Sequence, residues 1–131
     1  MCDRDDTPEN QRKWRESRLE EAMRKYVRDM GGIPYKFTSP GRRSVPDRLI
    51  VLPLRSPFWV EAKAWGQVPT DAQFREALRL LKLGQLVYFI DNMPHFKKVI
   101  DCPGILPSRV SPPSPKFLRF WRICQEQGVR V

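Results

Sequence analysis

The spacing of hydrophobic residues predicts an amphipathic helix near the N-terminus, from about residue 14 to residue 30. Its apolar positions recur at the spacing of one helical face: Leu19, Met23, Tyr26 or Val27, and Met30. Gly31 and Gly32 follow directly, a pattern typical of a helix C-terminus. Up to about residue 12 the chain is polar, and we expect that segment to be frayed.

Four segments after this helix have the patterns of β-strands. Residues 33–39 alternate apolar and polar side chains, and residues 47–52 and 58–65 are apolar runs joined by a short turn, which predicts a hairpin. Residues 85–91 are apolar almost throughout, so this strand should be buried on both faces. Residues 95–100 could add a short fifth strand.

A second helix is predicted between the third and fourth of these strands. Thr70 is its expected N-cap, and Gly84 follows its end. Its apolar stripe consists of Phe74, Ala77, Leu78 and Leu81. A strand–helix–strand crossover within a mixed sheet makes the chain α/β or α+β.

The composition of the chain changes near its C-terminus. Five of the 13 prolines lie between residues 103 and 115, which predicts an extended linker. A last helix is expected over about residues 116–127, and it either packs on the core or forms a dimer contact. We therefore divide the chain into a core, residues 1–101, and a C-terminal extension, residues 102–131.

The net charge narrows the class of partner. The 131 residues include 24 Lys and Arg against 15 Asp and Glu, which gives a formal net charge of +9. Such an excess favours a polyanionic partner, either nucleic acid or an anionic membrane surface. No apolar stretch is long enough to span a bilayer, and the basic residues are scattered rather than gathered on one helix. Nucleic acid is therefore preferred to a membrane.

Cysteine usage and the N-terminal residues indicate the compartment. The three cysteines form no C-x-x-C pair and no zinc-like spacing with histidine, which favours reduced thiols. The N-terminal residues are charged and lack the apolar segment of a signal peptide. We therefore expect a cytoplasmic protein.

Charged residues interrupt both strands of the predicted hairpin. Alternation places Trp59, Glu61 and Lys63 on one face of the second of these strands. Asp47 begins the first strand at about the same distance from the turn as Glu61, so hairpin pairing should bring the two carboxylates together. An ordinary Glu–Lys pair on a solvated face is the alternative, but Trp59 on the same face argues against it.

Two carboxylates and one ammonium group in one place define a candidate catalytic site. Like charges repel at short range, and burial increases the repulsion, unless a hard cation lies between them. Mg²⁺ takes one or two carboxylates together with water and phosphate oxygens. A lysine beside it can orient the attacking water or stabilise the transition state. The pattern therefore predicts metal-assisted phosphodiester hydrolysis, with basic residues binding the nucleic-acid backbone.

These residues carry a resemblance to a known family. Pro46-Asp47 followed by Glu61-Ala62-Lys63 resembles the PD-(D/E)XK nuclease signature. The longer run GGIPYKFTSPGRRSVPDRLIVLP…FWVEAKAWGQVPTDAQ resembles the VRR-NUC family of that superfamily, and the resemblance covers about residues 16–92. It implies a restriction-endonuclease-like α/β fold, a mixed sheet flanked by helices, with a C-terminal helical extension. It also implies a DNA endonuclease that depends on Mg²⁺ or Mn²⁺.

The resemblance assigns roles within the hairpin. Asp47 and Glu61 match the metal-binding acids, with the backbone carbonyl of Ala62 as an additional ligand, and Lys63 matches the catalytic lysine. The chain departs from the family pattern at two positions. Ala62 stands where leucine is more common, and Ser44 stands where glycine is usual. Neither departure removes a charged group, although Ser44 could change the turn that leads to Asp47.

Two residues outside the hairpin also match the family pattern, and both have ordinary structural alternatives. Glu20 of the first helix matches an acid that assists at the metal, but it could equally be a surface residue in helical salt bridges. The sequence leaves open whether Glu20 or Glu21 faces the site. Gln73 of the second helix matches a glutamine that positions water or substrate. It also fits a capping box with Thr70, and we expect the two roles to exclude each other.

Other basic and aromatic residues lie close to these positions in the sequence. Four basic residues flank the candidate site and are interpreted either as contacts to DNA phosphates or as a solvated surface: Lys36, Arg42, Arg43 and Arg48. Tyr35 and Phe37 are expected in the core rather than as base-stacking side chains. His95, the one histidine, is expected at the surface and not as a general base.

The family resemblance also implies a substrate. Small stand-alone VRR-NUC members resemble Holliday-junction or flap nucleases, often act as homodimers and in many cases are phage-encoded. A C₂ dimer would place two sites on opposing strands of a junction. We therefore expect cleavage of branched DNA, Holliday junctions first, in a bacterial or phage-infected cytoplasm. The alternatives are a flap, duplex or RNA-directed nuclease, and a non-catalytic nucleic-acid-binding module that keeps the fold.

Overall fold

The computed structural model describes residues 14–65, 67 and 69–101, together with the single positions 119, 122 and 126. Its elements follow in the order α2 (Glu16–Asp29), β1 (Ile33–Lys36), β2 (Arg48–Val51), β3 (Phe58–Ala62), α3 (Asp71–Lys82), β4 (Val87–Ile90) and α4 (Met93–Asp101). The linker and helix expected over residues 102–131 lie outside the described residues, apart from those three positions. No helix in the described part is long and apolar enough to cross a membrane.

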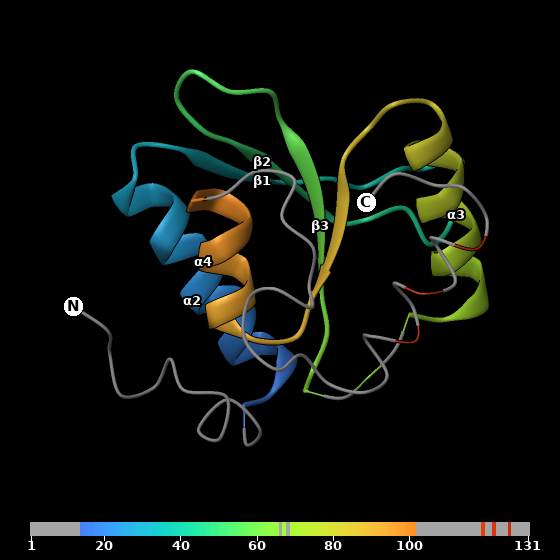
Figure 1. Ribbon diagram of the computed structural model, residues 1–131, viewed down its shortest axis with the longest axis horizontal. Coiled ribbons are helices and arrows are strands. Elements are labelled where there is room, and N and C mark those ends of the chain that lie inside the picture. The colour runs from blue at the N-terminus through green and yellow to red at the C-terminus, as the bar shows by residue number, and fades with distance from the viewer. Residues whose placement is uncertain are drawn as a thin grey trace.

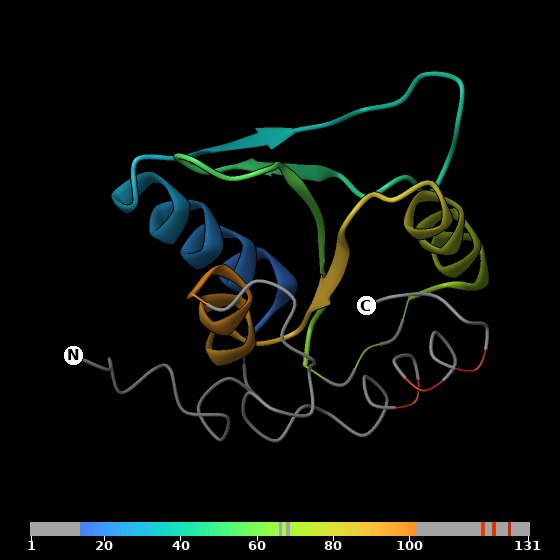
Figure 2. The same cartoon turned by 45° about the horizontal axis from the view of Figure 1, so that its top comes forward.

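The four strands form one mixed sheet with the order β1-β2-β3-β4. β1, β2 and β3 are antiparallel neighbours, as the predicted hairpin requires. β4 runs parallel to β3, and α3 makes the crossover that a parallel connection needs. In Figures 1 and 2, α2 and α4 lie on one side of the sheet and α3 lies on the other. The mixed α/β architecture predicted from the sequence is confirmed.

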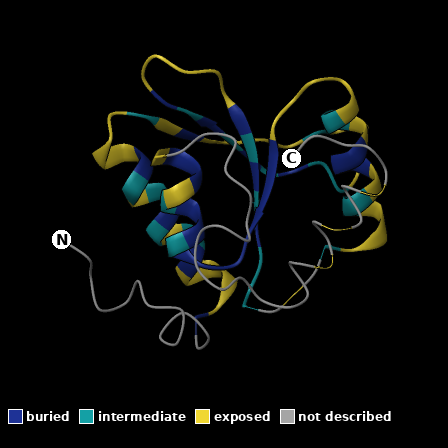
Figure 3. Ribbon diagram, in the orientation of Figure 1, coloured by how far each residue is buried: buried dark blue, intermediate teal, exposed yellow. Residues whose placement is uncertain are grey.

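Alternation along the strands divides the hydrophobic core in two. The larger cluster lies between the sheet and the pair of α2 and α4, where Val27, Val60 and Phe96 have no exposed surface. The smaller cluster joins residues of α3, such as Ala77, to residues of β4, such as Phe89. β4 contributes to both clusters and is dark blue throughout in Figure 3. Its predicted burial on both faces is therefore confirmed.

The helix α2 ends at the paired glycines, as predicted. Gly31 has a φ of +83°, in the left-handed region that favours glycine, and its N–H donates to the carbonyl of Arg28 at 2.9 Å. A Cβ atom at Gly32 would lie 2.5 Å from the carbonyl oxygen of Val51. A glycine at position 32 therefore allows the end of α2 to pack closely on β2.

The last described helix, α4, corrects two expectations. The fifth strand expected over residues 95–100 is wrong, because this segment forms α4. The side chain of Asn92 accepts a hydrogen bond from the N–H of His95 at 2.8 Å, which caps the helix, and Pro94 lies in the first turn, where proline is tolerated. His95 is 1% exposed rather than a surface residue, because the helical face that it shares packs into the larger core.

On the opposite side of the sheet, β1 has little cover. Ile33, Tyr35 and Phe37 are 48%, 52% and 39% exposed. The expectation that Tyr35 and Phe37 belong to the core is therefore wrong. Among the described residues, the cluster under α3 draws its strand residues from β3 and β4 and not from β1 or β2.

Candidate active site

The two acids of the hairpin lie side by side at one end of the sheet. The register pairs Arg48 with Val60, so Asp47 lies opposite Glu61 at the next position. The carboxylate oxygen Oε2 of Glu61 accepts a hydrogen bond from the backbone N–H of Asp47 at 3.1 Å. The proximity predicted from strand alternation and turn length is confirmed.

Gln73 of α3 reaches the same carboxylate. Its side-chain nitrogen Nε2 donates to Oε1 of Glu61 at 3.1 Å. Its side-chain oxygen accepts from the N–H of Thr70 at 3.0 Å, and its own N–H donates to the hydroxyl of Thr70 at 3.1 Å. The capping box and the contact with Glu61 therefore coexist, and the expectation that they exclude each other is wrong. A carboxamide carries both an acceptor and a donor, so the cap orients the amide toward Glu61.

The electrostatics of Glu61 show a site with surplus negative charge. Burial and repulsion from the carboxylate of Asp47 raise the pKa of Glu61 to about 7. The hydrogen bond from the Asp47 N–H and the positive charge of Lys63 act in the opposite direction but do not offset these two causes. A divalent cation between the two carboxylates would relieve this repulsion.

Lys63 lies immediately beyond the end of β3. Its backbone N–H donates to the carbonyl of Ile90 at 2.8 Å, which extends the pairing of β3 with β4 by one step. Its side chain is half-buried, and its ammonium group acts to lower the pKa of both Glu61 and Glu16. Lys63 therefore lies among the acids, as the sequence predicted for the catalytic lysine.

Glu16 is a site residue that the sequence interpretation missed. Partial loss of solvent raises the pKa of Glu16 against the opposing charge of Lys63, and the charges of Glu20 and Asp47 raise it further. Glu16 lies in the first turn of α2, one turn before Glu20 on the same helical face. In Figure 1 the N-terminal ends of α2 and α3 and the C-terminal end of β3 lie toward the same end of the molecule. The sequence signal for Glu16 is its four-residue spacing from Glu20, which places both side chains on one face of the helix.

Glu20 is half-buried, whereas Glu21 is exposed, so Glu20 is the acid that faces the sheet. Its carboxylate accepts a hydrogen bond from Nε of Arg48 at 3.3 Å. A second guanidinium nitrogen of Arg48 donates to the carbonyl of Pro34 at 3.3 Å. Arg48 is buried, with its side chain 10% exposed. It was expected either to contact DNA phosphates or to lie on a solvated surface, and its burial differs from both. Arg48 holds Glu20 and joins α2 to the sheet.

The other three basic residues lie on the loop between β1 and β2 or beside it. Arg42 donates from Nε and Nη2 to the two carboxylate oxygens of Glu76, at 3.2 and 2.8 Å. Glu76 is buried in α3, one turn after Gln73, so this ion pair ties the loop to the helix that carries Gln73. Lys36 and Arg43 are exposed.

Ser44 adopts a strained backbone conformation on the same loop. Its φ is +66°, in the left-handed region that favours glycine and is rare for other residues. This conformation explains why glycine is usual before the VPD run. The loop nevertheless delivers Asp47 to Glu61, so the serine does not prevent the approach of the two acids.

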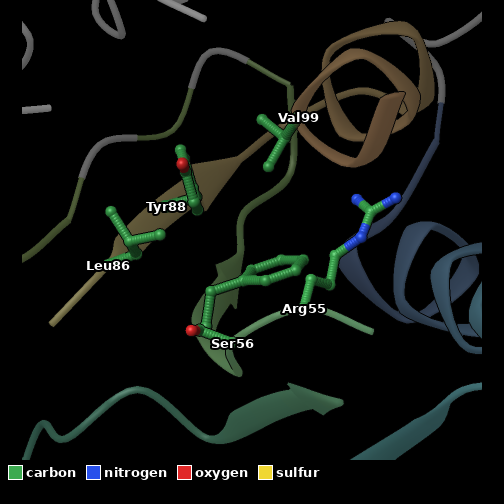
Figure 4. A pocket seen from close by; sticks show the side chains of 6 residues that line it. Arg55, Ser56, Leu86, Tyr88 and Val99 are labelled. Atoms are coloured by element: carbon green, nitrogen blue, oxygen red, sulfur yellow. The ribbon is translucent and has the colours of Figure 1, made fainter. Parts of the chain in front are cut away.

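A pocket of about 250 Å³ lies elsewhere in the molecule and is lined by Arg55, Ser56, Phe58, Leu86, Tyr88 and Val99. Figure 4 shows these side chains, which come from the turn after β2, from β3, from β4 and the residue before it, and from α4. None of the acids of the candidate site lines the pocket. This pocket is therefore separate from the candidate site formed by Asp47, Glu61 and Lys63.

Comparisons with known proteins identify the fold and the family. No protein-family model matches the chain. A solved structure described as "VRR_NUC domain" superposes with a TM-score of 0.63 at 28% identity, over 67% of this chain and 96% of that one. The fold and the paired acids with their lysine thus define a restriction-endonuclease-like protein.

A relative in sequence identifies the family more closely. "Putative nuclease p44" of Acyrthosiphon pisum secondary endosymbiont phage 1 is 46% identical over 94 residues, which is 72% of this chain and 94% of that protein. The chain belongs to the VRR-NUC family of nucleases. The resemblance noted in the sequence is confirmed.

Proposed function

We propose that this protein is a metal-dependent DNA endonuclease that hydrolyses phosphodiester bonds. The observation that carries the proposal is the half-buried pair of Asp47 and Glu61 beside Lys63, in which the pKa of Glu61 is raised to about 7. A carboxylate pair that is repelled and partly desolvated is unfavourable in itself, and such perturbed groups cluster at functional sites. Membership of a nuclease family supports the same reaction class.

The residues present fit a site for Mg²⁺ or Mn²⁺. Asp47 and Glu61 would hold the cation, with the backbone carbonyl of Ala62 as a further oxygen ligand. In the described part of the chain, no three His, Cys, Asp or Glu side chains are grouped closely enough to hold a metal ion. A pair of carboxylates is nevertheless enough for Mg²⁺, because this ion commonly binds to one or two carboxylates and keeps several waters. When bound, the cation supplies an activated water and offsets charge on the phosphate.

The chain's own residues position the reacting groups. Lys63 holds a positive charge next to Glu61, where it can orient the attacking water and stabilise the negative charge that develops on the phosphate. Gln73 fixes the orientation of the Glu61 carboxylate through Oε1, and its capping box limits the motion of its own side chain. Glu20, held by Arg48, assists from α2, and Glu16 lies beside it.

The basic residues on the β1–β2 loop and at the end of β1 are proposed to bind the DNA backbone. Lys36 and Arg43 are exposed next to the site, and each can contact a phosphate without reading sequence. Arg42 can do so with the half of its side chain that is exposed, in competition with Glu76. Arg48 is left out of this set because it is buried against Glu20. The net charge of +9 supports binding to a polyanion.

We further propose that the substrate is branched DNA, with a Holliday junction as the first candidate and a homodimer as the acting form. The similar phage protein supports a phage-infected bacterial cytoplasm as the place of action. Flap or duplex DNA is the alternative substrate. A non-catalytic binding module is the alternative function, although the chain retains Asp47, Glu61 and Lys63.

One cleavage panel tests the proposal. Wild type, Asp47→Ala and Lys63→Ala are incubated with junction, flap, duplex and single-stranded DNA in Mg²⁺, Mn²⁺ or a chelator. Lys82→Ala, an exposed lysine in the last turn of α3, is the matched control. The wild type and the control should cut branched DNA with a metal, and both site variants should not. A wild type that cuts nothing, or site variants that cut like the control, would refute the proposed function.

A further inference from the structure

An exposed aromatic strip adjoins the candidate site on the sheet. Tyr35 of β1 and Phe37, which directly follows this strand, are 52% and 39% exposed, whereas Pro34 on the other face is buried. The ring of Phe37 contacts the ring of Trp59 edge-on, with centroids 4.9 Å apart and planes at 86°. Trp59 therefore fixes the orientation of Phe37 while part of the Phe37 ring remains open.

The strand register places this strip directly beside the paired acids. The N–H of Phe37 donates to the carbonyl of Asp47 at 2.7 Å, and Asp47 in turn lies opposite Glu61. Phe37, Asp47 and Glu61 thus form one row across three strands. Tyr35 lies two residues earlier on the same face, about 7 Å along the strand from Phe37. The aromatic strip and the acids are continuous.

The chemistry around the strip favours a nucleic acid over a second copy of this chain. The exposed cation Arg43 lies on the loop that joins Phe37 to Asp47, and the whole chain carries a net charge of +9. The free edge of β1 is poorly suited to strand pairing between copies, because Pro34 has no N–H to offer there and Lys36 places a charge on it. Exposed aromatic rings among cations are the features that bind unstacked bases.

We propose that Tyr35 and Phe37 form a stacking site for an unpaired nucleobase next to the phosphate that is cut. The inference rests on the proposed nuclease function and deepens it, since it makes an unpaired nucleotide beside the branch a determinant of substrate choice. Asp47 is the neighbouring position in the row, so a base stacked on Phe37 would hold its own phosphate within reach of the paired acids. A fully paired duplex keeps its bases stacked internally and gains nothing from these rings.

The test measures DNA binding in a protein that cannot cut. Tyr35→Ser and Phe37→Leu are each made in the Lys63→Ala background, with Leu83→Ala as the control. Leu83 is 70% exposed and lies at the opposite end of α3 from Gln73. The probes are a flap DNA with one unpaired 2-aminopurine at the branch and a fully paired duplex of the same sequence, both in Mg²⁺.

Both aromatic variants should lose about 5- to 100-fold in affinity for the flap, in line with the stacking energy of one base, and keep the affinity for the duplex. The fluorescence of the 2-aminopurine should be quenched on binding to the control and recover with Tyr35→Ser. Since Tyr35 is half exposed, that variant should keep the circular dichroism spectrum of the control.

Two outcomes would overturn the inference. In the first, the aromatic variants bind the flap DNA with the same affinity as the control, and the duplex likewise. The other is a dimer in sedimentation that the aromatic variants convert to a monomer while DNA affinity is unchanged, which would assign the strip to a second copy of this chain. Failure of the nuclease function itself would appear separately, as absence of cutting by the protein with Lys63 intact.

Discussion

Two ionisable side chains on opposite sides of the sheet show that burial has different consequences in the scaffold and in the site. His95 lies on the buried face of α4, against the larger core, where burial lowers its pKa to about 4. Glu61 lies half-buried on the side of α3, where burial and the charge of Asp47 raise its pKa to about 7. Both shifts favour the neutral form. Glu61, however, also accepts hydrogen bonds from Gln73 and from the Asp47 backbone.

This difference distinguishes the packed scaffold from the candidate site. A neutral imidazole is tolerated in an apolar core at neutral pH because it needs no countercharge. The carboxylate of Glu61 experiences opposed influences, since burial and Asp47 disfavour its charge while Lys63 and the hydrogen bond from Asp47 favour it. A cation bound next to such a carboxylate would lower its pKa and favour its charged form. A metal-assisted nuclease requires this charged form to hold the metal.

The largest expected effect on stability concerns His95. Its folded pKa of about 4 lies below the ordinary value of 6.5, so the unfolded chain binds more protons between these values. The free energy of unfolding should therefore fall as the pH drops from about 6.5 to about 4, by about 3 kcal/mol from this group. Urea unfolding at several pH values measures it. His95→Leu should flatten this dependence, and an unchanged slope in that variant would assign the effect to other groups.

Glu61 should produce the opposite dependence in metal-free protein. Its folded pKa of about 7 lies above the ordinary 4.5, so the stability that protonation contributes is lost as the pH rises from about 4.5 to about 7. The loss should be about 2 kcal/mol after allowance for solvent screening. Glu61→Gln should remove it and be more stable than wild type at pH 8, whereas the exposed control Glu21→Gln should match wild type. Equal stability of both variants would contradict the charge repulsion.

A smaller effect is expected at Ser44, on the loop that leads to Asp47. Because Ser44 has a φ of +66°, Ser44→Gly should relieve backbone strain and raise the free energy of unfolding by about 1 kcal/mol. Ser39→Gly on the same loop, where φ is not positive, should lower stability slightly. Thermal unfolding compares the two. Destabilisation by both glycines would show that Ser44 is not strained.

The hairpin chemistry could be predicted from the sequence because it depends on local rules. A period of two fixes the faces of Glu61 and Lys63, and the length of the turn fixes the partner of Glu61 as Asp47. The same alternation could have excluded Arg48 from the phosphate contacts, because it follows Asp47 directly and so points to the covered face. The capping box of Gln73 was also readable, but its compatibility with Glu61 depended on side-chain geometry.

The rest depended on long-range packing. The four-residue spacing puts Glu16 on the helical face of Glu20, but no pattern within α2 reveals that the start of this helix lies near Lys63 and Asp47. The exposure of Tyr35 and Phe37 follows from α3 covering β3 and β4, which the alternation of β1 cannot show. The segment at His95 has too few residues to distinguish strand from helix by period, and the cap from Asn92 decided it.

The central claim, that Asp47 and Glu61 form the metal site of a nuclease, is tested most directly by removing the charge of Glu61. Single-turnover cleavage of one branched DNA is measured for wild type and Glu61→Gln at pH 8, with Mn²⁺ or with a chelator. We expect the wild type to cleave the DNA with Mn²⁺ and not with the chelator. The cleavage rate of Glu61→Gln with Mn²⁺ should be lower by at least about 100-fold, although that variant is the more stable protein. Cleavage by Glu61→Gln at the wild-type rate, or cleavage that persists in the chelator, would contradict the assignment of Asp47 and Glu61 as the metal site of a nuclease.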